Sequence, residues 1–206
     1  MNTQPITDFN TGILTRTTVF FGKTGAGKTS LLNCLFNLNW KTDDALSCTK
    51  ELVSHTYLPF EFSPKQKTPL RIVDSPGIAE SQLADKIYFP LYVKILSEAQ
   101  QIIWVFQADT RVYEPDQVAI KKFIPYLRRD IDFVIALNQV DYMSPIDWNS
   151  KNNTPSESQQ LNIEERITDV IDHFKKVLPC SIHAVIPCSA KYGYGRESLI
   201  NLIFNE

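Results

Sequence analysis

The chain has 206 residues, with 21 Lys or Arg against 23 Asp or Glu, so its formal net charge is −2. This balance excludes a general electrostatic attraction to nucleic acid or to an acidic membrane surface, and no sequence feature points to DNA. Hydrophobic residues make up 43% of the chain, which is enough to bury a core, and the length fits one domain.

Short apolar runs alternate with longer stretches of helical periodicity, as is typical of an α/β domain with a mostly parallel sheet. Strands are predicted at residues 17–21, 53–62, 70–74, 102–106, 133–137 and 182–187. Helices are predicted around residues 31–38 and at 81–99, 115–128, 161–177 and 197–204, with Asp116 near the start of the third helix. Residues 1–16 are expected to form an N-terminal extension, and residues 17–206 one domain.

One segment differs from the rest in composition. Residues 149–160 are polar apart from a single proline. Because patterned helix and strand resume after it, this stretch is predicted to be a mobile surface loop rather than a domain linker.

Several features bear on the cellular compartment. The chain has no C-x-x-C pair and no histidine at zinc-ligand spacing from a cysteine, so Cys34, Cys48, Cys180 and Cys188 are predicted to be reduced thiols. The first residues lack the basic and apolar regions of a signal peptide, and no apolar run approaches the ~20 residues that span a bilayer. The sequence therefore predicts a cytoplasmic protein without a membrane span.

A glycine-rich motif lies between the first predicted strand and the first predicted helix. Residues 22–29 fit G-x-x-x-x-G-K-[ST] and read Gly22, Lys23, Thr24, Gly25, Ala26, Gly27, Lys28 and Thr29. The glycines let backbone N–H groups and the helix N-terminus face a phosphate. Lys28 adds a positive charge at the β- and γ-phosphates, and the Thr29 hydroxyl is a ligand for Mg²⁺. A tight structural turn is the alternative, which the strand–turn–helix setting disfavours.

A carboxylate ends the third predicted strand, in the sequence Asp74-Ser-Pro-Gly77. Beside a P-loop, a carboxylate in this position is suited to Mg²⁺. The Gly77 N–H can reach a γ-phosphate and can pivot when that phosphate leaves. Taken alone, Asp-x-x-Gly is a common turn.

Two further motifs follow the last two predicted strands. In Asn138-Gln-Val-Asp141, a carboxylate can accept hydrogen bonds from guanine N1–H and the N2 amine, which adenine does not offer. In Ser189-Ala190-Lys191, a backbone N–H can reach guanine O6. An Asx turn is the alternative for the first of these. The order of all four motifs, each after a strand, favours a guanine nucleotide.

With these motifs, nearly the whole chain resembles an Era-like GTPase of the translation-factor-related class, and especially the bacterial and prophage-borne ribosome-binding-type members. The resemblance implies a P-loop G domain with a six-stranded, mostly parallel sheet, helices on both faces and the nucleotide at the carboxyl edge. It implies Mg²⁺ ligands at Thr29, Thr49 and Asp74. It also implies nucleotide contacts from Gly22, Thr24, Gly25, Ala26, Gly27, Lys28, Thr29, Ser30, Asp74, Gly77, Asn138, Gln139, Asp141, Ser189, Ala190 and Lys191.

Two residues depart from the family pattern. Gln139 stands where a lysine stem usually lies along the purine, which is expected to lower affinity without removing the guanine preference. Ile78 follows Gly77 where Ras-type enzymes place the glutamine that orients water, and isoleucine cannot hydrogen-bond water. Gly25 replaces the asparagine of potassium-dependent relatives, so potassium activation is not expected.

The sequence therefore predicts a GTP/GDP-binding switch with slow Mg²⁺-dependent hydrolysis, in which Lys28, Thr49 and Gly77 serve the γ-phosphate. The alternative is a GTP-dependent assembly module with negligible hydrolysis, which Ile78 favours. Asp141 disfavours an ATPase. The expected partners are a second copy of the chain or a protein or ribosomal effector, and Arg111 is either a solvated or paired arginine or a group that assists catalysis across a dimer.

Overall fold

The computed structural model describes residues 15–42, 51–79 and 81–204, and the strands in this part of the chain form one six-stranded sheet. The strand order is β2-β3-β1-β4-β5-β6. Only β2 runs antiparallel to its neighbour β3; the other described neighbours are parallel. The strands are β1 (Arg16–Phe21), β2 (Val53–Tyr57), β3 (Leu70–Asp74), β4 (Gln101–Gln107), β5 (Asp132–Asn138) and β6 (Ile182–Pro187).

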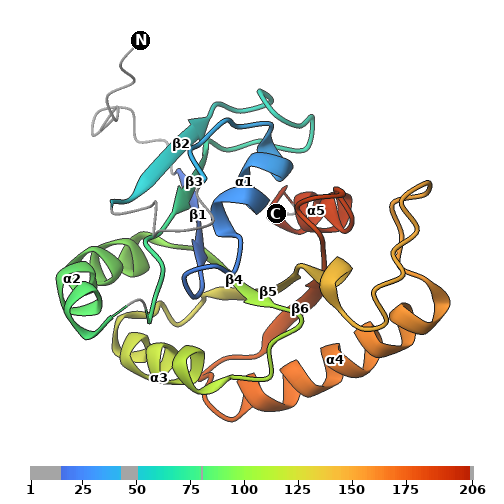
Figure 1. Ribbon diagram of the computed structural model, residues 1–206. Coiled ribbons are helices and arrows are strands. Elements are labelled where there is room, and N and C mark those ends of the chain that lie inside the picture. The colour runs from blue at the N-terminus through green and yellow to red at the C-terminus, as the bar shows by residue number, and fades with distance from the viewer. Residues whose placement is uncertain (1–14, 43–50, 80, 205–206) are drawn as a thin grey trace.

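Helices cover both faces of this sheet (Figure 1). On one face, α1 (Lys28–Phe36) and α5 (Arg196–Phe204) bury aliphatic and aromatic side chains against the sheet. On the other face, the same is done by α2 (Gln82–Glu98), α3 (Glu114–Phe123) and α4 (Glu157–Lys175). The predicted fold class is therefore confirmed.

The central strands lie in the core because their middle residues, 102–106 and 133–137, are apolar without interruption. Every residue of β4 from Gln101 to Phe106 is buried, as is every residue of β5 from Phe133 to Asn138. Continuous apolar runs are typical of parallel strands that have helices on both faces. Since parallel strands share one carboxyl edge, the segments after β1, β3, β4, β5 and β6 all leave the sheet on the same side.

Two predicted elements are shorter in the structure than the sequence indicated. The strand predicted over residues 53–62 ends at Tyr57, and Phe60 then takes a left-handed φ of 63° in a turn. The helix predicted over 115–128 ends at Phe123 and continues as a 3-10 turn, Ile124–Tyr126. Pro125 explains this end, because proline has no N–H to donate to the helix.

The predicted mobile loop at 149–160 is wrong in its second half, because α4 begins at Glu157 rather than near residue 161. Ser156 caps the helix by accepting a hydrogen bond from the Gln159 N–H at 3.1 Å. Residues 149 and 154 form a β-bridge, so the first half is a short turn. The apolar side chains Ile163, Val170 and Phe174 of α4 are buried.

None of the helices in the described ranges is long and apolar enough to cross a lipid bilayer.

Candidate functional site

The glycine-rich loop leaves β1 and turns sharply into α1. Gly22 has a φ of 148°, and a Cβ at this position would lie 2.2 Å from the Val105 carbonyl oxygen, so no other residue fits without moving β4. Gly27 precedes α1 with a φ of 82° and provides no side-chain cap. With no capping side chain at Gly27, the N-terminus of α1, whose first turn includes the exposed Ser30, is suited to an anion.

Lys28 is buried, with only 7% of its surface exposed. Its Nζ donates hydrogen bonds to the carbonyl oxygens of Gly22 and Lys23, both at 3.0 Å. These bonds hold the ammonium group against the loop backbone. A buried ammonium group held against the loop backbone is a positive charge suited to an anionic ligand.

Thr29 and Asp74 are 45 residues apart in sequence and meet at the carboxyl edge of the sheet. The Thr29 hydroxyl donates to Asp74 Oδ2 at 2.5 Å. One hydroxyl and one carboxylate fit Mg²⁺, which keeps several waters and binds proteins through few ligands. No cluster of three His, Cys, Asp or Glu side chains that could enclose a metal occurs in the described residues. Thr49, the third expected ligand, lies outside them.

The segment after Asp74 is fastened to the P-loop. The Ile78 N–H donates to the Gly22 carbonyl oxygen, and the Thr24 N–H donates to the Ile78 carbonyl oxygen, both at 3.2 Å. A Cβ on Gly77 would lie 2.1 Å from Thr24 Oγ1 and 2.8 Å from Thr24 Cα, so only glycine allows this approach. The Tyr92 hydroxyl supports the turn by donating to the carbonyl oxygens of Pro76 and Gly77.

Ile78 points into the hydrophobic core, with 2% of its surface exposed. The sequence prediction that Ile78 cannot orient water agrees with this position, because the side chain lies away from solvent. Because the buried Ile78 side chain packs against its neighbours, its truncation is expected to affect stability.

Ile78→Ala is expected to lower the free energy of unfolding by about 2–5 kcal/mol, because it leaves a cavity in a packed core. Urea unfolding followed by circular dichroism measures this loss. Ile87→Ala is the control, since Ile87 on α2 is 61% exposed and should change stability little. Equal stability of the Ile78→Ala protein and the parent would contradict the burial of Ile78.

Asn138 connects the P-loop to the last motif. Its Nδ2 donates to the Ala26 carbonyl oxygen at 2.9 Å, and its Oδ1 accepts from the Ala190 N–H at 3.2 Å. Its side chain therefore spans segments 112 and 52 residues away. Gln139 adds a weaker link, with a left-handed φ of 65° and a 3.3 Å bond from Nε2 to the Gly25 carbonyl oxygen. The simple Asx turn that the sequence left open is not what Asn138 forms.

Asp141 lies in a 3-10 turn, Val140–Tyr142, and is 4% exposed. Neither of its carboxylate oxygens accepts a hydrogen bond from the residues that the structure describes. Lys191 is exposed, and its Nζ lies 4.8 Å from the ring centroid of Tyr192 and 5.9 Å from that of Tyr142. Ser189 is buried, and its N–H donates to the Tyr194 carbonyl oxygen. The last two motifs thus lie together around a carboxylate that accepts no hydrogen bond within the described ranges.

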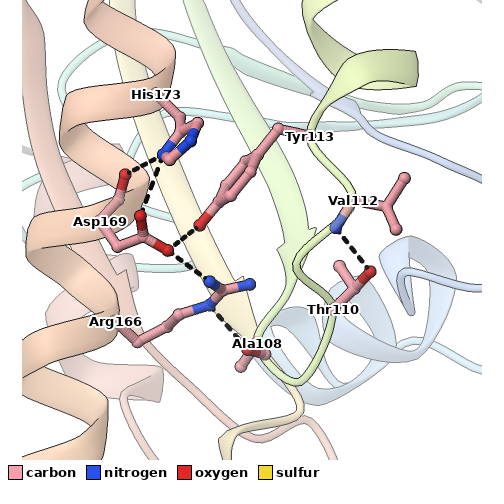
Figure 2. Close-up of polar contacts among 7 residues, drawn as sticks. All are labelled: Ala108, Thr110, Val112, Tyr113, Arg166, Asp169 and His173. Atoms are coloured by element: carbon pink, nitrogen blue, oxygen red, sulfur yellow. Dashed lines mark hydrogen bonds and ion pairs between the residues drawn. The ribbon is translucent and has the colours of Figure 1, made fainter.

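Sequence reasoning assigned no role to a polar cluster that holds the segment after β4 (Figure 2). Arg166 Nε donates to the Ala108 carbonyl oxygen at 3.0 Å, and Arg166 Nη1 contacts Asp169 Oδ2 at 2.6 Å. The Tyr113 hydroxyl donates to the same oxygen at 2.6 Å, and its ring stacks on His173 at 4.0 Å between centroids. The i, i+3 and i+7 spacing of Arg166, Asp169 and His173 on α4 was visible in the sequence, but their partners in the segment between β4 and α3 were not.

Arg111 lies in the segment that this cluster anchors, and its side chain is exposed. Trp148 stacks on Tyr192 at 5.3 Å between ring centroids, and Asp147 accepts a 2.7 Å hydrogen bond from the Ser156 hydroxyl. Trp148 and Asp147 therefore both hold a turn.

Asp116, which the sequence placed near a helix start, is fully buried inside α3. It accepts a hydrogen bond from Trp104 Nε1 at 2.9 Å. Burial raises the pKa of Asp116 to about 6, although Trp104 and the nearby charge of Lys23 act in the opposite direction. Burial likewise raises the pKa of Cys188, whose thiol lies beside Asn138, so this cysteine is protonated and inert.

A parallel sheet whose carboxyl edge carries a phosphate-binding loop, a carboxylate beside the loop threonine and a buried aspartate after β5 defines a P-loop GTPase domain. Residues 17–139 match the protein family described as 50S ribosome-binding GTPase, and the chain belongs to this family. The predicted resemblance is thereby confirmed.

Among curated proteins, the uncharacterized protein YfjP of Escherichia coli is 31% identical over 164 residues, which cover 78% of this chain and 53% of YfjP. The chain spans about half the length of the curated relatives it matches.

Two solved structures illustrate the shared fold. Aquifex aeolicus Era bound to GDP·AlF4⁻ is 19% identical, with a TM-score of 0.68 over 93% of this chain and 56% of that one. Arabidopsis thaliana Toc33 in complex with GDP and Mg²⁺ is 15% identical, with a TM-score of 0.70 over 93% and 84%. At these identities the likeness establishes the fold.

Proposed function

We propose that this chain binds GTP and GDP with Mg²⁺, hydrolyses GTP slowly and acts as a nucleotide-controlled switch. The observation that carries this proposal is the double hydrogen bond of Asn138, which joins the phosphate side of the site at Ala26 to the base side at Ala190. One nucleotide can therefore contact both sides. The P-loop GTPase family to which the chain belongs supports the same activity.

On the phosphate side, Lys28 and the N–H groups of residues 22–30 bind the phosphate oxygens. Thr29 and Asp74 would hold Mg²⁺ together with Thr49. The ion would neutralise charge on the β- and γ-phosphates when bound. The Gly77 N–H senses the γ-phosphate. Gly77 lies so close to Thr24 that a group inserted between them must shift the segment after Asp74, which is the expected behaviour of a switch.

On the base side, the Asp141 carboxylate accepts hydrogen bonds from guanine N1–H and N2, and a backbone N–H of the 189–191 segment donates to O6. Gln139 and the alkyl stem of Lys191 cover the faces of the purine. A buried carboxylate that receives no hydrogen bond from residues 15–42, 51–79 or 81–204 favours a ligand that supplies two donors, and adenine supplies none in this arrangement.

Hydrolysis is proposed to be slow because Ile78, the residue after Gly77, is packed in the core and provides no group to water. The burial of Ile78 also favours the alternative, an assembly module that binds GTP with negligible hydrolysis. The dependence of turnover on protein concentration separates the two.

Phosphate release from saturating GTP and Mg²⁺ is expected to be slow at low protein concentration and equal in potassium and sodium. A rate per molecule that rises with concentration places a catalytic group on a second copy, and Arg111→Ala then abolishes the rise because a guanidinium neutralises transition-state charge. Arg129→Ala, another exposed arginine, is the control. A fast intrinsic rate or strong potassium stimulation would contradict the interpretation of Ile78 or Gly25.

The partners remain part of the proposal: a second copy of the chain, or a protein or ribosomal effector. The family description and the structure of Era with nucleotides of 16S ribosomal RNA support a ribosomal effector.

The three described cysteines are free thiols, which supports a cytoplasmic protein. We also propose residues 1–16 as an extension to a domain at 17–206. A pull-down from lysate with the protein in GTP-analogue and GDP forms tests the effector.

A further inference from the structure

Gln159 lies in the first turn of α4, and its side chain is directed at the turn that carries Asp141. It is fully buried. Its Nε2 lies 2.9 Å from the Met143 carbonyl oxygen, 3.4 Å from that of Val140 and 3.5 Å from that of Asp141. All three neighbours are acceptors, so the amide nitrogen must face them.

These contacts meet a need of the 3-10 turn Val140–Tyr142. A single turn of this type leaves carbonyl groups without partners at its end, and buried carbonyl groups need donors. The Met143 N–H donates to the Val140 carbonyl oxygen, and the amide of Gln159 reaches the carbonyl oxygens of Asp141 and Met143, 18 and 16 residues away in sequence. Gln159 therefore fixes the backbone on which the Asp141 carboxylate is mounted.

The oxygen of the Gln159 amide indicates that the side chain is buried for the sake of its donor, Nε2. Its Oε1 is buried and accepts no hydrogen bond from the described part of the chain. A buried, half-satisfied amide destabilises a core relative to an apolar side chain. The helix that carries it is itself fixed, by the Ser156 cap and by the bond from Asn162 Nδ2 to the Ser144 carbonyl oxygen at 2.7 Å.

We propose that Gln159 is a positioning residue for guanine selectivity: it holds Asp141 at the position where the carboxylate can accept hydrogen bonds from N1–H and the N2 amine of guanine. This inference rests on the proposed guanine-nucleotide binding. Hydrogen bonds weaken steeply when distance and angle are lost, so a small shift of the 140–143 backbone reduces the contribution of Asp141 while the phosphate contacts of the P-loop stay intact.

The experiment measures the affinities of GDP and IDP for the full chain and for Gln159→Met. The two nucleotides differ only in the N2 amine, from which Asp141 is proposed to accept a hydrogen bond. The Met side chain has similar length and no donor. Gln159→Met is expected to narrow the GDP-over-IDP affinity ratio by about tenfold. The control is Gln160→Met, the same change one residue on. This side chain donates to Glu164 at 2.9 Å and accepts from the Tyr194 hydroxyl at 3.5 Å, and neither contact involves residues 140–143, so the ratio should stay unchanged.

A merely structural role would weaken GDP and IDP equally, so an unchanged ratio in Gln159→Met overturns the inference. If Gln159→Met is not recovered folded, Gln159→Glu decides, because glutamate keeps the size of the side chain and places a carboxylate against three carbonyl oxygens. A parental GDP-over-IDP ratio in Gln159→Glu, or loss of folding in both variants, also overturns the inference. A parent chain that binds ADP as tightly as GDP would instead refute the proposed function, whatever the variants do.

Discussion

Lys28→Ala is expected to reduce GDP and GTP affinity by more than about 100-fold, because a charge-assisted contact to phosphate is lost from a buried position. Lys28 is the only P-loop side chain that brings a buried positive charge against the loop in the described structure. Titration with a fluorescent GDP analogue measures the affinity.

The fold of the Lys28→Ala protein is expected to survive. The Gly22 carbonyl oxygen keeps its bond from the Ile78 N–H, and alanine is well suited to the first turn of α1. Circular dichroism on the same sample checks this, and Lys94→Ala, an exposed lysine on α2, is the matched control for loss of charge. Unchanged affinity in a folded Lys28→Ala protein would refute the phosphate-binding role of the loop.

The parts of the site that the sequence predicts well are those in which a few adjacent residues determine both local conformation and chemistry. Gly22, Gly27 and Lys28 lie in one eight-residue loop, and the positive φ angles found there need glycine. The meeting of Thr29 with Asp74 follows from parallel strands that end at one edge. Such features need no knowledge of distant contacts.

The parts that could not be predicted depend on contacts between distant segments. Gln159 looks like one more polar residue in a polar stretch, and only the docking of α4 on the 140–143 turn gives its amide three acceptors. Arg166 has the spacing of an exposed helical residue, yet its side chain is 6% exposed because it reaches Ala108 under the segment after β4. Asp116 reads as a helix-start carboxylate, and the indole of Trp104 on the strand beneath makes it a buried one.

Asp141→Asn is expected to exchange guanine for xanthine selectivity. The amide of asparagine can donate to the xanthine 2-oxo group where the carboxylate accepted from the guanine amine, while its oxygen still accepts from N1–H. Because position 141 is buried, the asparagine amide cannot donate to water when it faces the guanine amine. GTP affinity should therefore fall by about 10- to 100-fold, and XTP affinity should rise.

Competition of GTP, XTP and ATP against a labelled nucleotide measures this exchange. Asp147→Asn is the control, since Asp147 lies six residues further on, is exposed and bonds Ser156 rather than facing the site. A parent chain that binds ATP as well as GTP would show that Asp141 does not read the base. If Asp141→Asn instead weakens GTP and XTP alike, Asp141 supports the turn between β5 and α4. Base selectivity would then have to come from the backbone of residues 189–191, where one N–H donated to O6 would distinguish guanine from adenine by a single hydrogen bond.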